Sequence, residues 1–160
     1  MAARMHLVHG PQGAGKSAYA RQLEWELPAV RFSLDEWMST LFVPDMVPPL
    51  DMGWLSERMG RCEGLIWDMA AAVLRNGGDV VMDLGFQRRE QRDEARRRAR
   101  VLGADVLFHL PDGPRDARWS RVRRLDDFPG DAMGGDQAAR GDDYDPPSPQ
   151  EAGTIHGVLL

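Results

Sequence analysis

The stretch Gly10-Pro11-Gln12-Gly13-Ala14-Gly15-Lys16-Ser17 decides how the rest of the chain is interpreted. It matches the pattern G-x-x-x-x-G-K-[ST], and it lies between an apolar segment at 5–9 and a segment of helical pattern at 16–27. Glycines let the backbone curl so that successive N–H groups face one concavity at the positive end of a helix. The stretch therefore predicts a phosphate-binding loop between a strand and a helix.

Strand and helix patterns alternate along the rest of the chain. The expected strands are 5–9, 30–34, 79–83 and 105–110, and the expected helices are 16–27, 35–41, 55–73, 88–102 and 115–125. The longest helix rests on an apolar stripe made of Leu55, Met59, Cys62, Ile66, Met69 and Val73. Residues 154–160 are either a fifth strand or a tail. This alternation predicts parallel β-α-β units with helices on both faces of one sheet.

The composition is that of one globular domain covering residues 1–160. No apolar run is long enough to span a membrane, and residues 1–4 do not resemble a signal peptide. The single cysteine, Cys62, excludes an intrachain disulfide, and the four histidines lack the spacing of metal ligands. These features predict a cytoplasmic protein whose histidines are structural.

The charge pattern favours a small anionic ligand. The net charge is −5, and lysine occurs once, as Lys16. Twelve arginines fall between Arg88 and Arg124, but acidic residues balance them, whereas nucleic-acid binders usually carry a clearly basic domain.

A GTPase would need an N-K-x-D signature, which the chain lacks because Lys16 is its only lysine. The second acid that motor ATPases place after the third strand is absent too, since Leu84 follows Asp83.

The chain resembles the small P-loop kinases, the group that includes chloramphenicol phosphotransferase, zeta toxins and the 5′-kinase domain of polynucleotide kinase. It is most similar to short bacterial AAA-type ATP-binding proteins of that group. The resemblance rests on the phosphate loop and, in order, on residues 32–37, 80–86, 118–124 and 144–147. It implies a P-loop NTPase fold, α/β, with a single doubly wound parallel sheet of five strands in the order 2-3-1-4-5. A short arginine-rich lid at about 113–135 and a tail at 136–160 would follow.

The resemblance also implies roles for individual residues. Lys16 would contact the β- and γ-phosphates of ATP, Asp35 would be the general base for the acceptor hydroxyl, and Ser17 and Asp83 would hold Mg²⁺. The other residues expected at the nucleotide are Gly10, Gln12, Gly13, Ala14, Gly15 and, from the lid, Arg118. As alternatives, Asp35 could merely cap the following turn, and Asp83 could merely bind neighbouring N–H groups.

Arg121 and Arg124 are the candidates for stabilising charge on the transferred phosphoryl group. The family's lid usually spaces two arginines four apart, whereas four residues beyond Arg121 stands Leu125, so Arg124 is a shifted substitute. The alternative is that these arginines are solvated surface charge. Gln87 and the arginines that begin the helix at 88–102, Arg92 among them, could face a substrate.

Together these observations predict an enzyme that uses ATP and Mg²⁺ to phosphorylate a hydroxyl of a small molecule. Two alternatives stay open: a toxin-like or regulatory ATP-binding protein without a small-molecule acceptor, and a nucleic-acid 5′-kinase. Nucleic acid is disfavoured by the charge, and no membrane partner is expected. Trp37, Trp54 and Trp67 surround the loop after Asp35, where they could line an apolar acceptor pocket or pack in the core.

Overall fold

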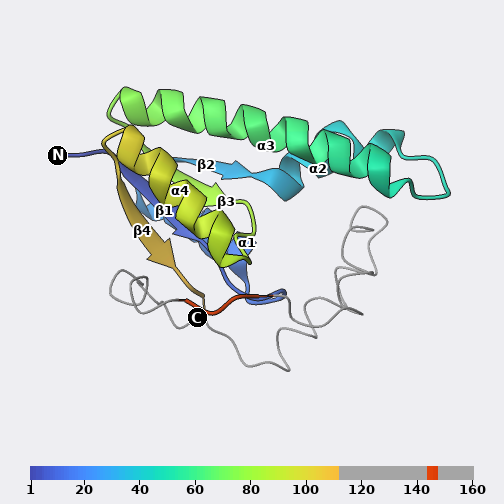
Figure 1. Cartoon of the computed structure of the whole chain (residues 1–160), viewed down its shortest axis with the longest axis horizontal. Helices are drawn as coiled ribbons and strands as arrows, with labels where there is room; N and C mark the ends of the chain where they lie inside the picture. The colour runs from blue at the N-terminus through green and yellow to red at the C-terminus, as the bar shows by residue number, and fades with distance from the viewer. Residues whose placement is uncertain (112–143, 148–160) are drawn as a thin grey trace.

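Four parallel strands form the described part of the sheet, in the order β2-β3-β1-β4 (Figure 1). The computed structural model describes residues 1–111 and 144–147. The strands are β1 (Arg4–Val8), β2 (Ala29–Ser33), β3 (Asp79–Asp83) and β4 (Asp105–His109). The helices are α1 (Lys16–Glu26), α2 (Leu34–Leu41), the short 3-10 helix η1 (Val43–Asp45), α3 (Met52–Arg75) and α4 (Arg89–Val101).

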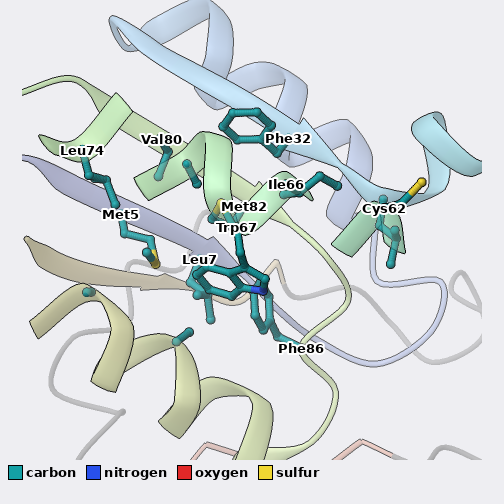
Figure 2. Close-up of a cluster of buried hydrophobic side chains, with 14 of the residues drawn as sticks. Met5, Leu7, Phe32, Cys62, Ile66, Trp67, Leu74, Val80, Met82 and Phe86 are labelled. Atoms are coloured by element: carbon teal, nitrogen blue, oxygen red, sulfur yellow. The ribbon is translucent and has the colours of Figure 1, made fainter. Parts of the chain in front are cut away.

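Alternation along the strands gives the sheet two apolar faces. In β1, Met5 and Leu7 pack in the larger core with α3 and α4, whereas Val8 packs on the opposite face with α1. Figure 2 shows the larger core, in which Trp67 and Ile66 of α3 lie over side chains of the central strands. Both faces of the sheet are therefore covered, as the alternating pattern predicts.

The predicted sheet is confirmed for the strands that the structure describes. The observed order is the first four positions of the predicted order, and every strand boundary lies within one residue of the prediction. The helix expected at 115–125, the fifth strand or tail at 154–160 and most of the lid lie outside the described residues. The extent of the domain, 1–160, therefore stays a prediction.

The apolar stripe that the sequence predicts for α3 is wrong at Met69. Met69 is exposed, whereas Trp67, Ala70 and Leu74, which the stripe leaves out, are buried. Each helical residue turns the side-chain direction by about 100°, so these three lie to one side of the stripe. The buried face turns that way because Trp67 packs edge-on against Phe86, with ring centroids 6.3 Å apart.

None of the helices in the described residues is long and apolar enough to cross a membrane.

Candidate functional site

The predicted phosphate loop connects β1 to α1. Gly15 is the N-cap of α1 in the left-handed conformation (φ 85°), and no side chain caps the helix. A Cβ at Gly10 would lie 3.2 Å from Leu110 Cδ1, so the loop passes close to the end of β4. The first N–H groups of α1 therefore face the loop without a side-chain acceptor, which is the arrangement that binds phosphate.

The Lys16 ammonium lies against the loop that precedes it. Its Nζ donates to the carbonyl oxygens of Gly10 at 3.1 Å and Pro11 at 3.0 Å. The positive charge is thus held next to the loop backbone, where it can interact with a phosphate bound by the loop. The prediction that Lys16 belongs to the phosphate loop agrees with this position.

Asp83, the last residue of β3, is buried beside the loop. Its carboxylate is hydrogen-bonded to the Ser17 side chain, and within the described residues its Oδ2 has no hydrogen-bond partner. Burial, followed by the negative charge of Asp35, raises the pKa of Asp83; the Ser17 hydrogen bond and Lys16 oppose this. A buried carboxylate oxygen beside a hydroxyl is the oxygen donor set that Mg²⁺ prefers, so these residues fit the metal that the sequence implies.

Asp35 lies in the first turn of α2, close enough to Asp83 for its charge to act on that carboxyl. The strand register explains the proximity, because Ser33, at the end of β2, pairs with Asp83. The alternative that Asp35 caps the turn is wrong. Ser33 is the N-cap, and its hydroxyl accepts from the Glu36 backbone at 3.4 Å. Asp35 is exposed, and its carboxylate is therefore accessible to an acceptor.

The loop after β3 reaches the phosphate loop from the other side. The Gln87 side-chain amide donates to Gln12 Oε1 at 3.2 Å. Phe86 has a positive φ of 47°, which is unfavourable for a side chain of this size, and it is nonetheless buried against Trp67. Packing thus holds the loop in a strained conformation that points Gln87 toward Gln12.

The three tryptophans pack against different aromatic residues. Trp37 packs edge-on against Phe32 and Trp54 against Phe42, at centroid distances of 6.4 and 6.3 Å. Trp67 alone of the three lines a described cavity, one of about 270 Å³ between α3 and α4. Leu84 and Phe86, from the loop after β3, line the same cavity. These contacts agree with the alternative that the tryptophans pack in the core. The cavity beside Trp67 adjoins the loop after β3.

Arg118, Arg121 and Arg124 lie outside the described residues, so their predicted roles stay predictions. Arg92, which the sequence places among possible substrate contacts, is fully buried. That prediction is wrong for Arg92, because its guanidinium points into the protein toward backbone carbonyls. No cluster of three potential metal-ligating His, Cys, Asp or Glu side chains occurs in the described ranges 1–111 and 144–147.

Residues 144–147 return to the site from far along the chain. The Tyr144 hydroxyl lies 3.0 Å from Nδ1 of His9, the residue before Gly10. Figure 1 shows this segment, in red, beside the turn that leaves β1. The sequence singled out these residues only as part of the family resemblance, and no local pattern indicates which residues they contact.

A family model described as an AAA domain matches residues 5–138. The chain belongs to this AAA domain family. The match covers most of the chain and includes the phosphate loop, Asp35, Asp83 and the arginine-rich segment. No match was found among curated proteins.

Solved structures, a sugar kinase among them, share the fold of this AAA domain. A sugar kinase from Janibacter sp. is 19% identical, with a TM-score of 0.61, over 99% of this chain and 84% of that one. Kti12 from Chaetomium thermophilum, in complex with ADP-AlF3, is 14% identical, with a TM-score of 0.67, over 97% and 88%. A chain of the Pnkp1/Rnl/Hen1 RNA repair complex is 19% identical, with a TM-score of 0.61, over 91% of this chain.

The AAA domain spans only 38% and 48% of the two chains it matches in Pnkp1/Rnl/Hen1 structures. At identities of 20% or less, these likenesses show the fold alone. Together with the family match, they confirm the predicted resemblance: this is a P-loop kinase-like nucleotide-binding fold.

Proposed function

We propose that this AAA domain is a Mg-ATP-dependent kinase that transfers the γ-phosphoryl group to a hydroxyl of a small molecule. The observation that carries the proposal is the position of Asp83. Its buried carboxylate lies beside Ser17 of the phosphate loop and close enough to Asp35 for that charge to act on it, and one of its oxygens has no hydrogen-bond partner in the part of the chain that the structure describes. A phosphate loop, a magnesium-binding pair and an accessible second carboxylate are the parts that phosphoryl transfer to a hydroxyl requires.

Each part has a separate task. The uncapped N-terminus of α1 and the Lys16 ammonium bind the β- and γ-phosphates. Ser17 and Asp83 would hold Mg²⁺, which neutralises charge on the phosphates when bound. Asp35 accepts the proton of the acceptor hydroxyl while the oxygen of that hydroxyl forms a bond to the γ-phosphorus. At the same time the bond between the γ-phosphorus and the β–γ bridging oxygen breaks, and ADP leaves with the electron pair. Arg121 and Arg124 would stabilise charge on the transferred group.

The test begins with thermal unfolding of the full chain in the presence of Mg-ADP and of a non-hydrolysable ATP analogue. A ligand that binds only the native state raises the unfolding temperature, so Mg-nucleotide should shift it upward, and the Lys16→Ala variant should not respond. Alcohols, sugars, nucleosides and hydroxylated antibiotics are then added to the analogue complex. Compounds that give a further shift are assayed with ATP for a phosphorylated product.

A 5′-hydroxyl oligonucleotide belongs in the same assay, because one structure that shares the fold comes from an RNA repair complex. Product from the oligonucleotide and none from small alcohols would replace the small-molecule acceptor with a nucleic acid. A nucleotide-dependent shift with no acceptor of either class would leave an ATP-binding protein without transferase activity. Absence of any nucleotide shift would overturn the proposal.

A further inference from the structure

Arg92 of α4 is the largest of the fully buried side chains. Its Nη1 donates to the carbonyl oxygens of Phe86 at 2.9 Å and Gln87 at 3.2 Å. Its Nη2 donates to those of Asp145 at 2.8 Å and Pro146 at 3.4 Å. One guanidinium thus connects the loop after β3 to a segment more than fifty residues away in sequence.

The choice of arginine at this position needs an explanation. Ala95 and Ala99 lie on the same face of α4 and are also fully buried, so apolar residues satisfy the packing there. Arginine is almost never fully buried unless it is paired, since removing its charge from water is unfavourable. The planar fork of donors holds two pieces of backbone at a fixed separation, which an apolar side chain cannot do.

Residues 144–147 are held at further points. The Asp145 N–H donates to Gln87 O at 2.8 Å, and its carboxylate accepts from the Arg89 backbone at 3.0 Å, at the N-terminus of α4. The Arg92 guanidinium carbon also lies 5.5 Å from the centre of the Tyr144 ring. These contacts are all to the loop after β3 or to the first turn of α4.

The hydrogen bonds among Arg92, the loop after β3 and residues 144–147 extend to the phosphate loop at two places. Tyr144 contacts His9, which directly precedes Gly10. The backbone N–H of His9 donates to the carbonyl oxygen of His109 at 2.9 Å. Gln87, held by both Arg92 and Asp145, donates to Gln12 within the phosphate loop. Arg92 is therefore at the centre of a set of hydrogen bonds that reaches the phosphate loop from both sides.

We infer that Arg92 is a positioning residue for the nucleotide site: it holds residues 144–147 against His9 and Gln87, and through them it sets the conformation of the phosphate loop. The inference rests on the proposed nucleotide site. It predicts that loss of the guanidinium fork weakens nucleotide binding, although Arg92 does not touch the nucleotide.

The test measures Mg-ADP affinity of the full chain by calorimetry for Arg92→Lys, Tyr144→Phe and the double variant. A lost hydrogen bond to a charged donor corresponds to a rise in Kd of about tenfold or more for Arg92→Lys. Tyr144→Phe should also raise the Kd, and the double variant should be no weaker than the weaker single, because both act through one segment. Hydrogen exchange at the amides of Arg89 and Asp145 should become faster in Arg92→Lys.

Two controls separate positioning from a general loss of stability. Arg98→Lys changes an arginine of the same helix that pairs with Glu94 and stacks on Trp67. Ala99→Gly destabilises α4 without altering a hydrogen bond that Arg92 or residues 144–147 make. Both should keep the wild-type Kd.

A folded Arg92→Lys with the wild-type Kd would overturn the inference, as would independent, multiplying effects of the two substitutions. If Arg92→Lys does not fold, Asp145→Ala replaces it in the test, because it leaves Arg92 in place and removes the side-chain acceptor of the Arg89 N–H: a raised Kd supports the inference and a wild-type Kd overturns it. Failure of the wild-type chain to bind Mg-ADP would instead overturn the proposed function, so the two failures are distinguishable.

Discussion

The hydroxyl of Tyr19 lies 2.8 Å from Nδ1 of His109. Tyr19 is in the first turns of α1, just after the phosphate loop, and His109 ends β4. Nε2 of the same imidazole lies 3.0 Å from Nδ1 of His6 in β1, and all three side chains are buried. This chain of hydrogen bonds fixes the helix of the phosphate loop to two strands beneath it.

We expect Tyr19→Phe to lower the free energy of unfolding by about 1–3 kcal/mol, because His109 Nδ1 is left buried without this partner. Burial, with a smaller contribution from Glu26, raises the pKa of Tyr19 above its ordinary 10.0. A raised native pKa means that the contribution is complete below pH 10 and is lost as pH rises through the native value. Urea unfolding between pH 7 and 11 should therefore show a steeper alkaline loss in the wild type than in the variant.

Trp25→Phe provides the control for this prediction, since Trp25 lies on the same helix and is 89% exposed. It should leave both the midpoint and its pH dependence unchanged. Equal stability of Tyr19→Phe and the wild type would show that the hydrogen bond contributes nothing net.

Sequence patterns were sufficient for the four strands that the structure describes and for the proximity of Asp35 to Asp83. Consecutive parallel strands end at the same edge, so residues that follow them gather there, whatever their side-chain contacts are. Element boundaries and the phosphate loop were predictable for the same reason: they depend on local residue types and spacing. The Ser33 cap also follows a local rule, but it competed with Asp35, which is two residues away and has similar capping chemistry.

The roles of Arg92 and Tyr144 could not be predicted. The spacing of Arg92 from Ala95 and Ala99 puts it on the buried face of α4, but the charge of an arginine indicates a surface position. Its burial depends on four carbonyl groups, two from the loop that leads into α4 and two from residues 145–146, and no local pattern indicates the contact with the second pair. Met69 and Trp67 show the same limit on α3. Which of two adjoining helix faces is buried depends on what α4 and Phe86 place beside it.

Lys16→Ala should abolish nucleotide binding without unfolding the chain. The substitution removes the only lysine and its bonds to the Gly10 and Pro11 carbonyls, but Lys16 belongs to neither buried core cluster of the described residues. We expect an unfolding temperature close to that of the wild type and no further rise with Mg-ADP. Arg21→Ala, on an exposed part of α1, is the control that should respond normally; full activity of Lys16→Ala would end the kinase proposal.

Asp83→Asn should stabilise the protein in the absence of Mg²⁺ and nucleotide. Burial raises the pKa of Asp83, so its ionised form is unfavourable in the native state, and stability falls as pH rises from 3.8 through the native pKa. Asn removes that penalty at pH 7. Urea unfolding should show a higher free energy of unfolding for the variant without ligand, and the reverse order with saturating Mg-ADP. A variant that responds fully to Mg²⁺ would exclude Asp83 from the metal site.

Replacing Arg121 or Arg124 by Ala should lower kcat more than it raises KM for ATP, because the proposed role is in the transition state. A loss of about 10²-fold or more in kcat is typical for a group that stabilises developing charge. Arg123→Ala is the matched control, since in the helix that the sequence predicts at 115–125 a spacing of three would put residues 118, 121 and 124 on one face and leave Arg123 off it. A raised KM with unchanged kcat would assign these arginines to nucleotide binding instead.

The mechanism depends most on Asp35. Asp35→Asn keeps the size and polarity of the side chain but cannot accept the proton of the acceptor hydroxyl, so kcat should fall by about 10²–10⁴-fold. Mg-ADP affinity and slow hydrolysis of ATP should persist, because the phosphate loop and the Ser17–Asp83 pair are intact. Since Ser33 caps α2, the substitution should also leave the free energy of unfolding nearly unchanged. Steady-state transfer, calorimetry and urea unfolding on the same preparation check all three, and a destabilised variant with normal kcat would place the base elsewhere.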